Sequence, residues 1–207
     1  MRKVEKVFID VGIDDHLALV KIRYALDIIK NETIKIVILI VLFSVAGSMK
    51  EFLFAAIILF PLRFTSGGMH LKTNIGCFLF SLSFFVSTIW ILPLIQTPFG
   101  LLFSLLIVST IVIIVLSPIA SYKRPIHTNS RLKTLRRNAI IFIIVDFLVL
   151  IILWRFGIYT YFVIGTWVVT LQAIQLLATW VYRKKKGGKN VTEDQGIEAR
   201  ISSDNDT

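Results

Sequence analysis

Two long apolar runs without a charged residue constrain the fold of this chain more than any other feature. Residues 77–95 form a run of nineteen, and residues 101–118 form a run of eighteen. A helix that crosses the hydrocarbon core of a bilayer needs about 20 predominantly apolar residues, which both runs nearly supply. The 207-residue chain is also 56% hydrophobic, whereas soluble domains are usually about 45–50% apolar. The sequence therefore predicts one membrane domain.

Six apolar segments follow one another along the chain. They are residues 33–49, 52–62, 77–95, 101–118, 139–154 and 156–182. The second has only eleven residues, so at about 1.5 Å per residue it must thin the membrane, extend into its neighbours or stop partway. Lys35 lies near the start of the first segment, where its ammonium group can snorkel to the interface. The fold class that we expect is all-α: a polytopic helical integral membrane protein with about six transmembrane or partly spanning segments, preceded by amphipathic helices.

The two ends of the chain differ from this membrane part. In residues 2–30, apolar residues recur at helical spacing on two short helices separated by Gly12. Basic residues on the opposite faces suit a helix on the cytoplasmic membrane surface, and an ordinary packed helix pair fits equally well. Residues 187–207 are polar and acidic, a composition that predicts disorder. We therefore expect a membrane domain over residues 1–186 and a disordered tail after it.

Basic residues in the links between the segments predict the orientation. Links with few charges alternate with links rich in Lys and Arg. The basic links are residues 63–72, 122–138 and 183–189. Because cytoplasmic loops carry an excess of Lys and Arg, we expect a multi-pass protein of the cell membrane with both termini in the cytoplasm. The same pattern accounts for the net charge of +10 without a nucleic-acid partner, since the basic residues do not line an aromatic-rich groove.

The candidate chemistry lies in residues 63–77, RFTSGGMHLKTNIGC. This stretch holds the only cysteine, Cys77, and one of three histidines, His70, which make a candidate nucleophile and base. On a continuous helix the two residues would be separated by about 10.5 Å, which is too far for a hydrogen bond. The pair can therefore work only if the helix is interrupted between them, and the glycines of the stretch permit this.

The start of the following helix decides what Cys77 can do. If the helix begins near Asn74, Cys77 lies in its first turn, where the macrodipole favours the thiolate and free amides could stabilise an oxyanion. Arg63 and Lys72 add positive potential. The competing interpretation is a small buried cysteine beside an interfacial His70. One cysteine and one histidine fall short of a zinc ligand set, so we expect no metal and no cofactor.

The stretch RFTSGGMHLKTNIGC resembles the signature of the accessory gene regulator B family, the peptide-processing cysteine proteases of quorum sensing in Gram-positive bacteria. The arginine, the glycine pair, the histidine and the cysteine occur in that order at the entrance of a membrane helix. The downstream SPIASYKRPIHTNSRLKTLRR is similar to the basic loop of that family. The resemblance covers about residues 1–185.

Carried over residue by residue, the resemblance implies that Cys77 is the nucleophile and His70 its base. The residues expected to bind substrate or shape the site are Arg63, Gly68, Lys72, Lys123 and Arg124. The implied substrate is a small precursor peptide with an amphipathic leader, a signal sequence and an acidic tail. Cleavage before the tail would leave the signal as a thioester on Cys77, which a Cys or Ser of the peptide could convert into a thiolactone or lactone ring.

The expected protein is thus a membrane-embedded cysteine peptidase, a hydrolase whose partners are the precursor peptide and the lipid bilayer. The sequence leaves open whether the product is cyclic or linear and whether the protein forms a homodimer. A non-enzymatic membrane transporter or exporter of a peptide is the alternative from another class, with Asp146, Gln172 and Gln175 as a polar path. Such a transporter should tolerate Cys77→Ala, whereas the peptidase should not.

The predicted topology can be tested with single cysteines introduced into a Cys77→Ala background. Cysteines within residues 122–138 should resist a membrane-impermeant maleimide in intact cells and react after permeabilisation, because the basic link faces the cytoplasm. Cysteines within residues 96–100 should react from outside and serve as the control. Labelling of residues 122–138 in intact cells would contradict the arrangement of six segments.

Overall fold

Helices make up the regular structure of residues 16–68, 73–119 and 129–204, the parts of the chain that the computed structural model describes. In order, the elements are α2 (His16–Val45), α3 (Met49–Ser66), α4 (Asn74–Val86), a π-helical turn (Ser87–Ile91), a 3-10 turn (Leu92–Leu94), α5 (Phe99–Leu116), α6 (Asn129–Arg155) and α7 (Tyr159–Asp204). These residues contain no strand, and only an isolated bridge joins Gly67 to Ile119. The predicted all-α class is confirmed.

Four helical segments are long and apolar enough to cross a membrane. They are Ile75–Leu94, Phe99–Leu116, Leu132–Arg155 and Tyr159–Tyr182, which correspond to the last four predicted segments. The polytopic membrane fold is therefore confirmed, while the count of about six remains a prediction because α2 and α3 lie outside this set. The short second segment extends into its neighbours, since α3 has 18 residues and spans about 27 Å at 1.5 Å per residue.

The N-terminal part of the described chain differs from the prediction of a separate amphipathic helix. The segment that should end near residue 30 continues without interruption into the first apolar segment, giving the single 30-residue helix α2. The physical reason is that no glycine or proline occurs between His16 and Val45 to end the helix. The predicted break at Gly12 and the helix before it lie outside the described residues.

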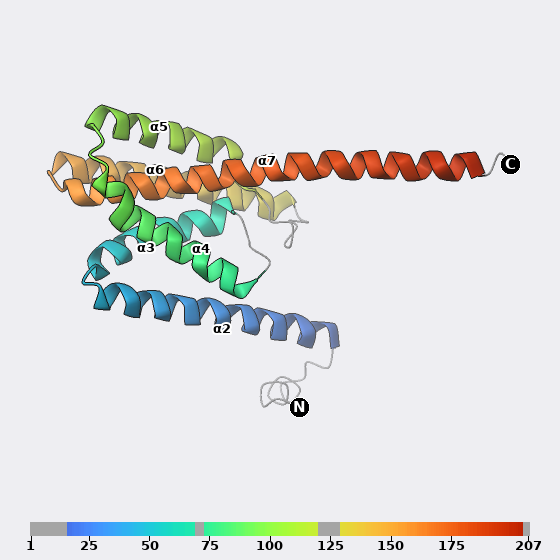
Figure 1. Ribbon diagram of the computed structural model, residues 1–207, viewed down its shortest axis with the longest axis horizontal. Helices are drawn as coiled ribbons and strands as arrows, with labels where there is room; N and C mark the ends of the chain where they lie inside the picture. The colour runs from blue at the N-terminus through green and yellow to red at the C-terminus, as the bar shows by residue number, and fades with distance from the viewer. Residues whose placement is uncertain (1–15, 69–72, 120–128, 205–207) are drawn as a thin grey trace.

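The central helix of the bundle is α7. In the 18-residue apolar stretch within Tyr159–Tyr182, 67% of the residues are buried, against 22% or fewer in the corresponding stretches of the other three membrane segments. It packs against α3, α5 and α6, while α2 lies at the outer edge against α3 and α4 (Figure 1). Close approach depends on Gly165 of α7, where a Cβ atom would overlap the side chain of Leu150 and lie 3.2 Å from Cδ1 of Ile58. Small residues allow such contacts between membrane helices.

The polar end of α7 continues the helix beyond its apolar part. Helix α7 continues to Asp204 and extends beyond the bundle, whereas composition predicts disorder in residues 187–207 (Figure 1). Continuation is permitted because no proline occurs in α7. A polar helix without packing partners is marginal in water, and the glycines at 187 and 188 weaken it further. Disorder of this tail in solution therefore remains a prediction.

Replacement of Gly165 tests the packing at the centre of the bundle. Gly165→Leu should destabilise the protein by on the order of 1–3 kcal/mol or more, because the new side chain would overpack the contact with Leu150. The measurement is the thermal unfolding midpoint of the purified protein in detergent. Gly100→Leu is the control, since a Cβ atom at Gly100 meets nothing within 4 Å. Equal midpoints for the two variants would contradict the role of Gly165.

Candidate active site

Cys77 lies in the first turn of α4, as the sequence predicts. The helix begins at Asn74, and its N-cap Thr73 accepts a hydrogen bond from the backbone N–H of Gly76 at its Oγ1, 3.1 Å away. The N–H of Cys77 donates to the carbonyl oxygen of Thr73 at 3.1 Å. Since the amides of Gly76 and Cys77 are engaged, an oxyanion at this turn would have to use those of Asn74 or Ile75.

The helix is interrupted between the candidate base and the candidate nucleophile. Helix α3 ends at Ser66, and Thr73 has the extended backbone angles φ −108° and ψ 147° before α4 begins. His70 and Cys77 therefore do not share one continuous helix, which is the condition that their pairing requires. His70 itself lies outside the described residues.

The last turn of α3 brings Arg63 to the same end of α4. The guanidinium carbon of Arg63 lies 5.8 Å from the centroid of the Phe80 ring, a cation–π distance, and the side chain is half-buried. Arg63 also interacts electrostatically with Cys77. The structure thus places the guanidinium group of Arg63 beside α4, the helix that carries Cys77.

The glycine pair that follows α3 is closely packed, with no room for a side chain at Gly67 and little at Gly68. Gly67 has φ 85°, and a Cβ atom there would overlap the backbone oxygen of Ile119. The N–H of Ile119 donates to the carbonyl oxygen of Ser66 at 3.0 Å, so the chain after α5 is joined to the end of α3. Gly68 has φ 156°, and its Cβ atom would lie 3.3 Å from Oε1 of Gln175. Both positions therefore favour glycine.

A buried glutamine on α7 holds this junction. Nε2 of Gln172 donates hydrogen bonds to Oγ of Ser66 and to the carbonyl oxygen of Gly67, both at 3.0 Å. The side chain is fully buried. Sequence reasoning had placed Gln172 on a transport path and missed this role, although a glutamine pair in an apolar span is itself a signal of a polar contact between membrane helices. The neighbouring Gln175 is 5% exposed, and its amide has no hydrogen-bond partner within the described part of the chain.

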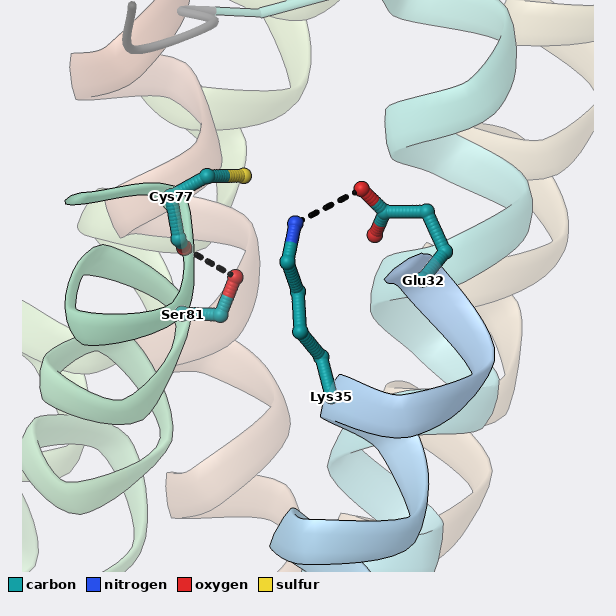
Figure 2. Close-up of polar contacts among 4 residues, drawn as sticks. All are labelled: Glu32, Lys35, Cys77 and Ser81. Carbon is teal, nitrogen blue, oxygen red and sulfur yellow. Dashed lines mark hydrogen bonds and ion pairs between the residues drawn. The ribbon is translucent and has the colours of Figure 1, made fainter. Parts of the chain in front are cut away.

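A lysine from α2 also reaches Cys77. The ammonium group of Lys35 donates a hydrogen bond to Oε1 of Glu32 at 2.9 Å, and its other neighbour is the thiol of Cys77 (Figure 2). Lys35 is only 9% exposed, so protein surrounds its side chain, and its position relative to the membrane interface stays a prediction. The burial arises because α2 packs against α4, which covers the lysine. In the sequence, a Glu and a Lys three residues apart beside an apolar run already indicated an ion pair.

Several predicted site residues lie outside the described residues. They are His70, Lys72, Lys123 and Arg124. In the described residues, no three side chains of His, Cys, Asp or Glu gather as metal ligands would. Among the predicted residues that the structure describes, Arg63 lies near Cys77, whereas Gly68 lies against Gln175 of α7 at the end of α3.

Comparison with known proteins gives one consistent family. The family model described as Accessory gene regulator B matches residues 5–176. The chain is similar to Accessory gene regulator protein B of Staphylococcus haemolyticus (strain JCSC1435), with 26% identity over 119 residues, 58% of this chain and 63% of the relative. It is 31% identical over 130 residues to an AgrB-like protein of Clostridium beijerinckii, which covers 61% of this chain and 64% of the relative.

A third relative is Accessory gene regulator protein B of Staphylococcus aureus (strain JH9), with 29% identity over 141 residues, 67% of this chain and 72% of the relative. The chain spans slightly less than two thirds of the length of the first two relatives. No solved structure matches the chain significantly.

The role of Gln172 can be tested against its neighbour. Gln172→Met should lower the thermal unfolding midpoint in detergent, because two hydrogen bonds are lost, each with a net value of about 0.5–1.5 kcal/mol, and Ser66 is left without its donor. Gln175→Met is the matched control. It removes a buried amide without partners and should be neutral or stabilising. A larger loss of stability for Gln175→Met would contradict this assignment.

Proposed function

The chain belongs to the accessory gene regulator B family, and we propose that it is a membrane-embedded cysteine endopeptidase that cleaves a precursor peptide through an acyl-enzyme on Cys77. Membership of the family connects the protein with quorum-sensing peptide processing in a membrane. The observation that carries the proposal is the position of Cys77, the only cysteine, in the first turn of a membrane helix beside Arg63 and Lys35.

The first chemical step is the formation of the nucleophile. His70 takes the proton of the Cys77 thiol, and the thiolate is stabilised by the positive end of α4 and by the nearby cations. The interruption between Ser66 and Asn74 supports this pairing, because it frees His70 from the spacing of a continuous helix. Arg63 and Gly68 shape the site, and Lys72 adds positive potential to the loop.

The second step transfers the peptide to the enzyme. The sulfur of Cys77 attacks the carbonyl carbon of the peptide bond that precedes the acidic tail, and the carbon–nitrogen bond breaks. The proton held by His70 passes to the leaving amine, and the signal part of the peptide remains as a thioester. Basic residues of the loops, including Lys123 and Arg124, would attract the acidic tail of such a precursor.

The third step closes a ring. A thiol or hydroxyl of the bound peptide attacks the thioester carbon and releases Cys77, which gives a thiolactone or a lactone. A thiol attack exchanges one thioester for another and nearly conserves the bond energy. Proximity within one bound chain can supply about 7–11 kcal/mol of the barrier in favourable cases, and a site at the lipid boundary limits competing water. Hydrolysis to a linear product is the competing outcome of the same acyl-enzyme.

A peptide transporter is less well supported than the peptidase. The proposed polar path would need Gln172, whose amide nitrogen already holds Ser66 and Gly67. Asp146 and Gln175 do carry buried polar atoms without partners among the described residues, so they remain the residues on which a transport function would depend.

Replacement of the two candidate residues tests the peptidase. Cys77→Ala and His70→Ala should each abolish cleavage of the cognate precursor in membrane vesicles, because the nucleophile or its base is lost. The measurement is the mass of the peptide products, with the enzyme level checked by immunoblot. Ser83→Ala, an exposed position on the same helix α4, is the control and should leave cleavage unchanged. Cleavage by Cys77→Ala at the wild-type rate would refute the proposal.

A further inference from the structure

Three charged side chains of the described residues gather at Cys77. Glu32 and Lys35 come from α2, and Arg63 comes from the last turn of α3. Both cations interact electrostatically with Cys77 and with Glu32. Figure 2 shows the thiol of Cys77 and the ammonium group of Lys35 directed into the same space between α4 and α2, with Glu32 on the far side of the lysine.

The charges in this cluster do not balance while Cys77 is a thiol. Lys35 and Arg63 contribute two positive charges, and Glu32 contributes one negative charge. Ionisation of Cys77 adds the second negative charge and makes the described cluster neutral. Because a buried charge without compensation is costly, this arrangement favours the thiolate.

In the ion pair between Lys35 and Glu32, the lysine is the more buried partner. The side chain of Lys35 is 11% exposed, whereas that of Glu32 is 55% exposed. Water therefore screens the carboxylate of Glu32 and weakens the compensation that it gives to the ammonium group. The thiolate of Cys77 is in the position to supply the rest, since it lies on the side of Lys35 opposite the carboxylate (Figure 2).

We propose that Lys35 is a positioning residue that holds Cys77 as the reactive thiolate, and that Glu32 orients the ammonium group for this task. The proposal rests on the proposed function only in identifying Cys77 as the nucleophile. It makes α2 part of the active site, because the helix that carries Lys35 must pack against α4 for the contact to exist. The other charged group of the described residues that acts on Cys77 is Arg63.

The test is the rate of alkylation of Cys77 by iodoacetamide in membranes, measured against pH. Cys77 is the only cysteine, so the intact chain reports on it without further substitutions. Lys35→Met should move the curve to higher pH and lower the rate at pH 7 by about tenfold, because an opposite charge at a few ångströms changes a thiol titration by about one pH unit or more. Lys35→Arg should restore the wild-type curve.

Two further variants distinguish an effect of charge on the alkylation curve from an effect of altered structure. Glu32→Gln keeps an oxygen that can accept the hydrogen bond of Lys35 and removes a negative charge, so the curve should stay in place or move to lower pH. Lys30→Met replaces an exposed lysine of the same helix and should leave the curve unchanged. If Lys35→Met fails to accumulate, Lys35→Gln replaces it in the same measurement.

The outcomes distinguish this inference from the proposed function. A displaced alkylation curve for Lys35→Met, together with slower precursor cleavage and recovery of both by Lys35→Arg, supports the role of Lys35. An unchanged alkylation curve overturns it, even if cleavage falls, because the effect would then be structural. Neither result depends on Cys77→Ala, whose cleavage activity separately decides whether Cys77 is the nucleophile.

Discussion

The candidate site depends on a hydrogen-bonded junction between the end of α3 and the central helix α7. Gln172 donates to Ser66 and Gly67 across 106 and 105 positions of sequence, and Gly67 lies against the backbone of Ile119. An unpaired backbone carbonyl is costly when it is buried, so a helix that ends at the buried Ser66 needs such a partner. The junction ends α3 at a fixed point and thereby sets where the chain turns back toward α4.

The electrostatics of the site follow from that geometry. Arg63 reaches the start of α4 because it lies in the last turn of α3, and Lys35 reaches it because α2 packs on the outer side of α4. Helices α2 and α3 thus each bring a cation to the thiol of Cys77, and α4 contributes its N-terminus. Placed away from bulk water, these interactions are stronger than the same charges would be on an exposed surface.

Much of the architecture was accessible from the sequence. The long apolar runs predicted the last four membrane segments, and a helix start expected near Asn74 predicted the place of Cys77 in the first turn of α4. These are local properties, set by composition and by the chemistry of helix ends. The helix end predicted near residue 30 was wrong. A change of polarity does not end a helix that contains no glycine or proline.

The sequence by itself determined a polytopic α-helical membrane protein, an interrupted helix between His70 and Cys77, and a cysteine at a helix start, since each depends on residues close together in the chain. Only the tertiary structure decided that Lys35 lies beside Cys77 and that Gln172 holds Ser66 and Gly67. Partners separated by 42 and by about 105 positions meet only when helices pack, and the choice among packings depends on close contacts such as the one at Gly165. Periodicity and composition do not encode such contacts, because many helix pairings satisfy the same apolar pattern in a bilayer.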